Sequence, residues 1–145
     1  RRVVASLSAL ARTRRVSVTT NIPREIPYVG DEAALHRAIF NVVDNAIKFA
    51  DNAVHIALST TPEVISLSVV DDGPGIPPEA RARIFQRFYR VDASRTSATG
   101  GSGLGLAIAY EVVQAHGGDI RVETAQGHGA TFLLSLPVPL AAPPL

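Results

Sequence analysis

Two alternating apolar patterns follow one another in VHIALSTTPEVISLSVVD, residues 54–71. The alternating apolar positions are Val54, Ile56 and Leu58, followed by Ile65, Leu67 and Val69. This alternation predicts two half-buried strands, and the break at residues 59–62 predicts a short turn between them. Consecutive strands joined by so short a turn pair antiparallel, which excludes a doubly wound parallel sheet.

Helices and further strands are predicted on both sides of this pair. Upstream we expect an amphipathic helix over 1–15, a strand over 16–21, and a helix capped by Asp31 that runs to about Ala50. Downstream we expect a short helix over 78–86, a helix over 102–116, and a closing hairpin with strands at 120–124 and 130–136. The predicted fold class is α/β (an α+β two-layer sandwich). A mixed, mostly antiparallel sheet of about five strands packs in it against about three helices.

The two longer helices each have an expected apolar face. In the helix from Asp31 these positions are Leu35, Ala38, Ile39, Val42, Ala46 and Phe49. In the helix over 102–116 they are Leu104, Ala107, Ile108, Val112 and Ala115. We expect both faces to pack on the sheet.

Length and composition limit the function classes. The 145 residues suit a single domain, with a core at about 16–137, an N-terminal helix over 1–15 and a flexible tail over 138–145. A net charge of +1 gives no reason to expect nucleic-acid binding, and the absence of cysteine excludes disulfides and thiolate metal sites. No apolar run reaches the length of a membrane span. The sequence starts with Arg1 and contains no Met, so we expect it to be part of a longer protein.

Asn41, Asn45 and Lys48 occupy one face of the predicted long helix. Their spacing places them within roughly 60° of one another around the axis. Asn supplies a neutral oxygen for Mg²⁺ beside phosphates, and Lys supplies a point charge for a phosphate. The alternative is a solvated face with chance asparagines, but Asn is a poor helix former and two of them need a reason.

Asp71 ends the second strand in register with its core-facing residues. Its carboxylate is therefore predicted to point inward, where it needs a donor such as an adenine amine. Gly73 and Gly75 follow and permit close approach of a planar ligand. The alternative is a tight Asp-Gly turn with a capping carboxylate.

A glycine-rich segment, Gly100-Gly-Ser-Gly-Leu-Gly105, leads into the helix predicted over 102–116. Free N–H groups at a helix N-terminus bind anions, although a plain glycine-rich linker is the alternative. The segment lacks the Gly-Lys-Ser/Thr of a Walker A loop and the spacing of a Rossmann fingerprint.

Upstream of this segment, Arg87 and Arg90 lie among aromatic residues. They can bind phosphate, or they can be solvated beside an aromatic core cluster. The four histidines show no metal-ligand spacing and are interpreted as structural or surface residues.

In their order, these segments resemble the catalytic ATP-binding domain of bacterial two-component sensor histidine kinases. Asn41-Val-Val-Asp-Asn-Ala-Ile-Lys-Phe49 resembles the N box and Asp71-Asp-Gly-Pro-Gly-Ile76 the G1 box. Ile84-Phe-Gln-Arg-Phe-Tyr-Arg90 resembles the F box, and Gly101-Ser-Gly-Leu-Gly-Leu106 the G2 box. The resemblance covers about residues 16–137 and implies the Bergerat (GHKL) ATP fold that gyrase B and MutL share.

The resemblance also implies roles for individual residues. Asp71 would bind the adenine amine, Asn41 and Asn45 would hold Mg²⁺, and Lys48 and Arg90 would contact phosphate beneath a lid at about 92–101. Asn41, Lys48 and Arg90 would be the catalytic residues. The residues implied to bind ATP are Asn41, Asn45, Lys48, Phe49, Asp71, Gly73, Gly75, Ile76, Tyr89, Arg90, Gly101, Ser102, Gly103, Leu104, Gly105 and Leu106.

Transfer is favoured over hydrolysis because the ATPases of this fold have a glutamate, the base that activates water, where this chain has Asn41. None of the four histidines is followed by the acid typical of a phosphoacceptor. We therefore expect the acceptor on a dimerisation domain outside this chain, a cognate response regulator as partner, and ATP and ADP as ligands. The chain alone is expected to be a monomer. The full-length protein is expected to be a homodimer that is anchored in a membrane, with this domain in the cytoplasm. The alternatives are a serine kinase of the anti-sigma-factor type and a nucleotide-sensing module without transfer; a GHKL ATPase fits Asn41 least.

Overall fold

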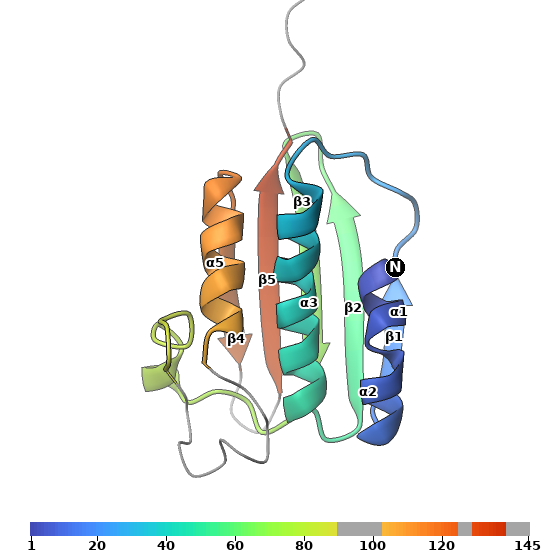
Figure 1. The fold of residues 1–145 in the computed structure, drawn as a ribbon, viewed down its shortest axis with the longest axis vertical. Coiled ribbons are helices and arrows are strands. Elements are labelled where there is room, and N and C mark those ends of the chain that lie inside the picture. The colour runs from blue at the N-terminus through green and yellow to red at the C-terminus, as the bar shows by residue number, and fades with distance from the viewer. Residues whose placement is uncertain (90–102, 125–128, 139–145) are drawn as a thin grey trace, which may run out of the picture.

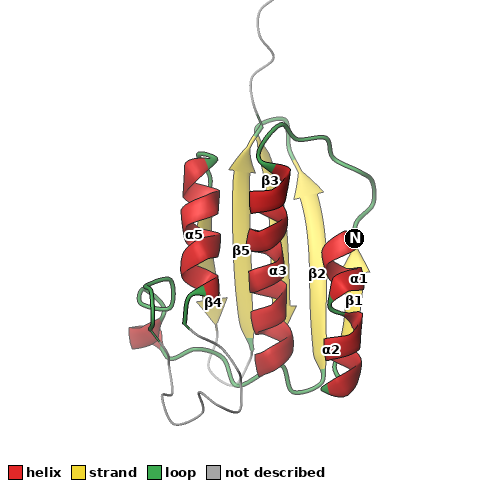
Figure 2. Cartoon of the chain, viewed as in Figure 1, coloured by secondary structure: helices red, strands yellow, loops and turns green. Residues whose placement is uncertain are grey.

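The computed structural model describes residues 1–89, 103–124 and 129–138, and these form two layers. Helices lie side by side over one face of a five-stranded sheet with the order β1-β2-β3-β5-β4 (Figures 1 and 2). The strands are β1 (Ser17–Asn21), β2 (Ala53–Thr60), β3 (Val64–Asp71), β4 (Asp119–Thr124) and β5 (Ala130–Pro137). Only β1 and β2 pair parallel among these strands, so the mixed, mostly antiparallel sheet predicted from the sequence is confirmed.

The long helix is α3 (Glu32–Phe49), and it begins as predicted because the Ala34 N–H donates to Asp31 Oδ1 at 3.0 Å. The expected apolar face is wrong at its end, since Phe49 is 43% exposed. It is also too narrow, because Val43 and Ile47 are fully buried. The helix packs against both the sheet and α5 (Gly105–Ala115), so two adjacent faces are covered.

The single helix expected over residues 1–15 is instead two short helices, α1 (Arg2–Ser6) and α2 (Ser8–Thr13). The hydroxyls of Ser6 and Ser8 bond to the carbonyls of Arg2 and Ala5, at 2.8 and 2.9 Å, on either side of the break at Leu7. Serine hydroxyls compete in this way with regular helix bonds. The apolar face stays continuous across the break, with Val3, Leu7 and Ala11 buried.

The helix expected over 102–116 is described from Gly105 to Ala115. Its end is as predicted: Gly117 has φ +75° and the Gly118 N–H donates to the Val113 carbonyl at 3.0 Å, a Schellman motif. The expected inward face is partly wrong, because Ala115 is exposed while Ala109 and Val113 are buried. Contacts with α3 as well as with β4 and β5 rotate the buried face toward these two residues.

The helix expected over 78–86 is only a 3₁₀ turn, η1 (Pro78–Ala80), followed by further turns. Most of its backbone bonds join residues three apart, such as Arg83 N–H to the Ala80 carbonyl at 2.9 Å. The segment is held by burial of Ala80 and Ile84. The part of the tail beyond residue 138 lies outside the described residues. Within the described part of the chain, no helix is long and apolar enough to cross a membrane.

Candidate functional site

The sequence motifs converge at one end of the molecule. The C-terminal end of α3, the end of β3 and the beginning of α5 all lie at the lower end in Figure 1. Because α3 and α5 pack side by side, the polar face of α3 lies next to the first turn of α5. The topology therefore brings together segments that are distant in sequence.

Asn41 on α3 directly contacts the start of α5. Its Nδ2 donates to the Gly105 carbonyl at 3.1 Å. A Cβ on Gly105 would lie 3.6 Å from Asn41 Cβ and Cγ, so the two helices are in side-chain contact here. Only the NH₂ end of an amide can donate to a carbonyl, so this bond leaves the Asn41 oxygen directed away from Gly105.

Lys48 forms an ion pair that the sequence analysis did not anticipate. Its Nζ lies 2.9 Å from Asp44 Oδ2 one turn earlier on α3, and both side chains are largely covered, at 21% and 24% exposed. Asn41, Asn45 and Lys48 are all half-buried on this helix. The only carboxylate of the N-box segment is therefore neutralised by the lysine of the same segment.

Asp71 is the one buried charged side chain among the described residues, 4% exposed, which confirms its predicted inward direction. Its Oδ1 accepts the backbone N–H groups of Gly73 at 2.9 Å and Ala130 at 3.3 Å. Burial raises the pKa of this carboxyl above its ordinary value, and the two hydrogen bonds oppose the rise. Both bonds end on Oδ1, so Oδ2 receives no donor from the described residues.

Two glycines make room around Asp71. A Cβ on Gly73 would lie 2.1 Å from the Phe49 carbonyl oxygen, and a Cβ on Gly129 would lie 1.8 Å from the Asp71 carbonyl oxygen. No side chain fits at either position without moving the backbone. Gly129 was not among the predicted site residues, although Gly129-Ala-Thr-Phe132 before the last strand also resembles the family.

Asp72 was also missed, although it follows Asp71 directly. Its Oδ1 accepts the N–H groups of Asp51, Asn52 and Ala53 at 2.9, 2.9 and 3.0 Å. The bonds from Ala53 and Asn52 are the main reason that the pKa of Asp72 is lowered. The available signal was strand alternation, which turns neighbouring carboxylates to opposite sides.

The F-box segment packs against the beginning of α5. The Phe88 N–H donates to the Gly103 carbonyl at 2.8 Å, with Phe88 at φ +66° and Gly103 at φ +79°. Arg87 donates from Nη2 at 2.7 Å and from Nε at 3.2 Å to the same oxygen, Oε1 of Glu111 on α5. The Arg87 side chain is 63% exposed, so it is solvated, as one of the two interpretations predicted, and it is also paired with Glu111.

The aromatic residues of this segment divide into two groups. Phe85 packs edge-on to Phe132 and beside Tyr110, with ring centroids 6.3 and 5.8 Å apart, and Tyr89 packs against the core. Phe88 is 71% exposed, so the expected aromatic core cluster is wrong for this residue.

The remaining proposed ligand-binding residues are placed as follows. Ile76 is half-buried, and its N–H lies 3.4 Å from Thr124 Oγ1. Gly75 has φ +80°, which suits glycine, and Leu104 and Leu106 flank the first residue of α5. Arg90, Gly101, Ser102 and the lid at 92–101 lie outside the described residues.

Two histidines have structural partners, as expected. The His116 Nε2 accepts the Asp31 N–H at 3.1 Å, and its Nδ1 lies 2.8 Å from the Val112 carbonyl, so it joins the start of α3 to the end of α5. His55 Nδ1 pairs with Thr19 Oγ1 at 2.8 Å. The described residues contain no group of three His, Cys, Asp or Glu side chains that could hold a metal.

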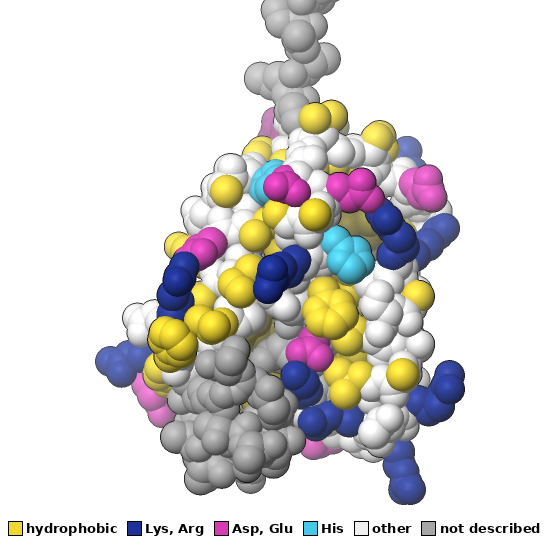
Figure 3. Space-filling model, in the orientation of Figure 1, with side chains coloured by type: hydrophobic (Ala, Val, Ile, Leu, Met, Phe, Trp, Pro, Cys, Tyr) yellow, Lys and Arg dark blue, Asp and Glu magenta, His cyan; other side chains and the backbone are white. Residues whose placement is uncertain are grey.

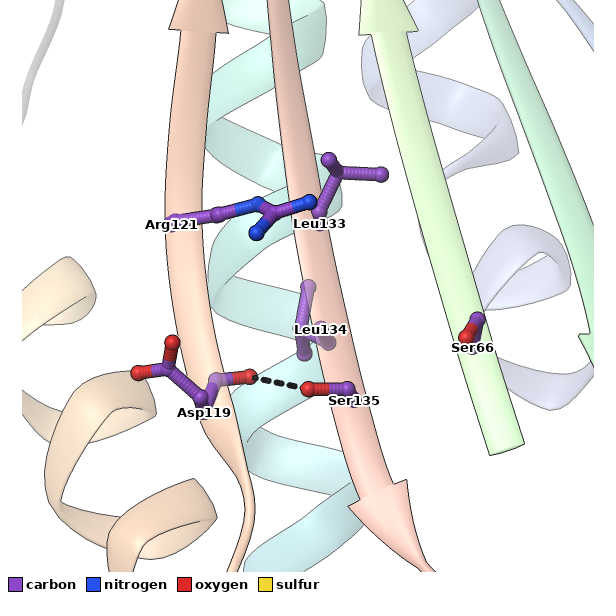
Figure 4. A pocket seen from close by; sticks show the side chains of 6 residues that line it. All are labelled: Ser66, Asp119, Arg121, Leu133, Leu134 and Ser135. Atoms are coloured by element: carbon purple, nitrogen blue, oxygen red, sulfur yellow. Dashed lines mark hydrogen bonds between the residues drawn. The ribbon is translucent and has the colours of Figure 1, made fainter. Parts of the chain in front are cut away.

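Two further features of the surface lie outside the candidate site. Basic side chains on the helix face are spread among acidic ones (Figure 3), which fits the net charge of +1. A hollow of about 130 Å³ lies on the sheet face opposite the helices (Figure 4). It is lined by Ser66, Asp119, Arg121, Leu133, Leu134 and Ser135. None of these belongs to the motifs, so the hollow is separate from the candidate site.

Comparison with known proteins identifies the class. Residues 30–140 match the family described as histidine kinase-, DNA gyrase B-, and HSP90-like ATPase, and the chain belongs to this family. Within it, the chain is a catalytic ATP-binding domain of the sensor histidine kinase type. The solved structure of the mycobacterial sensor histidine kinase MprB is 36% identical, with a TM-score of 0.77 over 94% of this chain and 91% of that one.

Two further proteins are similar. The sensor-like histidine kinase SenX3 of Mycolicibacterium smegmatis is 42% identical over 129 residues, which are 88% of this chain and 34% of SenX3. Full-length ShkA, solved in complex with AMPPNP, is 34% identical with a TM-score of 0.80 over 99% of this chain and 30% of that one. The chain thus spans about a third of the length of these relatives.

Proposed function

We propose that the chain binds Mg-ATP at the end where α3, β3 and α5 meet and presents the γ-phosphate to a histidine outside this sequence. The acceptor would lie on a dimerisation domain of the same full-length protein, a homodimer, with a cognate response regulator downstream. By analogy with sensor kinases, the domain would face the cytoplasm beneath a membrane-anchored sensor. The chain by itself would be monomeric.

The adenine end of the site would be formed by Asp71. Its Oδ2 has no donor from the described residues, whereas Oδ1 is held by two backbone N–H groups. A carboxylate oxygen in this position can accept the exocyclic amine of adenine. Phe49, Gly73, Gly75, Ile76 and Tyr89 would surround the base and ribose.

The phosphate end would lie along α3 and the start of α5. The Asn41 oxygen is available because its NH₂ group is bound to Gly105, and Asn45 is one turn away. Neutral amide oxygens beside phosphates suit Mg²⁺, which supplies charge neutralisation when bound. N–H groups at the start of α5, at Gly103, Leu104, Gly105 and Leu106, would face phosphate oxygens.

Lys48 would contact phosphate while remaining near Asp44. The ion pair holds the ammonium on the site face of α3, and its three N–H donors let Lys48 contact a phosphate while it stays paired with Asp44. Arg90, Gly101 and Ser102 are assigned to the phosphates from their places in the sequence motifs. The nearby carboxylate Asp44 would be unavailable to activate water as long as Lys48 neutralises it.

The observation that carries the choice of transfer over hydrolysis is this N-box face: an amide at Asn41 and a lysine-paired Asp44. General-base hydrolysis needs a base within reach of the water that attacks the γ-phosphate, and the ATPases of this fold use a carboxylate at the position of Asn41. We therefore expect tight Mg-ATP binding by calorimetry but only trace phosphate release. A turnover of about 1 per second or more, in the ordinary enzyme range, that is lost in Asp44→Asn would contradict the proposal.

A further inference from the structure

We infer that Asp72 is a positioning residue for adenine recognition: its carboxylate locks the turn after α3 to the end of β3 and so holds Asp71 in place. The inference rests on the proposed function, in which Asp71 accepts the adenine amine. Asp72 itself is exposed, and its carboxylate accepts backbone N–H groups of the turn after α3. It would act on the ligand through its neighbours.

The Asp72 carboxylate accepts several backbone donors at once. Oδ1 accepts three successive backbone N–H groups, from Asp51, Asn52 and Ala53, and Oδ2 accepts the Asn52 N–H as well at 3.2 Å. The Asp72 N–H in turn donates to the Ala53 carbonyl at 3.2 Å. Bonds to an ionised carboxylate are about twice as strong as neutral ones, so this turn depends on a single residue.

The turn held by Asp72 is in contact with the residues around Asp71. The turn directly follows Phe49, whose carbonyl oxygen lies only 2.1 Å from where a Gly73 Cβ would be. The two backbones are therefore in contact, and the Gly73 N–H is one of the two donors that orient Asp71. A shift of the turn would move Phe49 against Gly73 and disturb the hydrogen bond to Asp71.

The alternative is that Asp72 only stabilises the fold. The two possibilities differ in what they predict for ligand selectivity. A purely structural cap would change the melting temperature and reduce binding of all nucleotides in proportion to the loss of folded protein. A positioning residue would specifically change discrimination between adenine and a base that lacks the amine.

The test compares ATP with inosine triphosphate, which carries an oxo group in place of the amine, in the complete 145-residue chain. Kd for each nucleotide is measured by calorimetry with Mg²⁺ present, and folding is checked by thermal unfolding. The variants are Asp72→Ala, Asp72→Asn and the control Asp51→Asn. Asp51 lies in the same turn, and its exposed side chain makes no hydrogen bond among the described residues.

We expect Asp72→Ala to reduce the preference for ATP over inosine triphosphate by about fivefold or more, a part of the discrimination that one charged hydrogen bond supplies. Asp72→Asn keeps an acceptor oxygen and should lose less, and Asp51→Asn should lose nothing. If Asp72→Ala does not fold, the asparagine variant decides. The inference would be overturned if folded Asp72→Ala, or folded Asp72→Asn where the alanine variant does not fold, kept the wild-type preference for ATP over inosine triphosphate. The role of Asp71 would then still stand. If the wild-type protein does not prefer ATP over inosine triphosphate, the proposed role of Asp71 is wrong, and the inference about Asp72 is then wrong as well.

Discussion

Replacing Asp71 by asparagine should weaken ATP binding and at the same time stabilise the nucleotide-free protein. The replacement keeps the shape of the side chain, and its carbonyl oxygen can still accept the N–H groups of Gly73 and Ala130. The NH₂ group then occupies the place of Oδ2 and meets the adenine amine, donor against donor. Asparagine therefore removes only the charge and the acceptor that the ligand would use.

The size of the effect on binding follows from the loss of one charged hydrogen bond. Such bonds contribute about 1.5–3 kcal/mol, which corresponds to roughly 10- to 150-fold in Kd. Binding of inosine triphosphate, which offers no amine, should change much less. Asp51→Asn, which removes a charge nearby without touching the pocket, is the control.

The effect on stability has the opposite sign. The pKa of Asp71 is raised in the folded protein, chiefly by burial, so ionisation disfavours the folded state. The stability associated with the protonated form is complete below the unfolded value, near 3.8, and is lost as the pH rises through the raised pKa. Asp71→Asn should therefore raise the melting temperature at neutral pH, with the difference shrinking in acid. Unchanged calorimetric affinity for ATP in a folded variant would refute the reasoning.

Three further replacements test other parts of the site and fold. Asn45→Ala should weaken Mg-ATP binding more than binding of metal-free ATP in calorimetry; an equal loss for both would contradict the metal role. Gly129→Ala places a Cβ 1.8 Å from the Asp71 carbonyl oxygen, so it should cost about 3 kcal/mol or more in urea unfolding; a near-neutral change would mean that the backbone moves freely there. Asp31→Ala removes the cap on α3 and should cost about 1 kcal/mol by the same measurement, without altering ATP affinity.

The sequence predicted the elements whose signals are local. Alternation located β2 and β3, Asp31 located the start of α3, and a glycine pair located the end of α5. The inward direction of Asp71 followed from the same alternation, because parity in a strand is fixed by geometry. These features depend on a few neighbouring residues.

Features that depend on tertiary contacts could not be predicted in this way. The buried faces of α3 and α5 are set by each helix packing on the other as well as on the sheet, so Phe49 and Ala115 were misplaced. The three bonds of Asp72 depend on where the next turn lies. The Lys48–Asp44 pair is different, because its i, i+4 spacing on α3 is a local signal that was overlooked. The spacing of residues in the sequence shows which face of a helix or strand each side chain occupies, but not which groups it contacts there.

The most direct test of the account follows both fates of the γ-phosphate in one experiment. The chain, joined to a dimerisation domain that carries an acceptor histidine, is incubated with Mg²⁺ and γ-labelled ATP, and the label is counted on protein and as free phosphate. The account predicts acid-labile label on the acceptor histidine, its loss in Asn41→Ala, and little free phosphate. Rapid release of free phosphate with no labelled histidine would contradict the claim that this site transfers the phosphate rather than hydrolysing it.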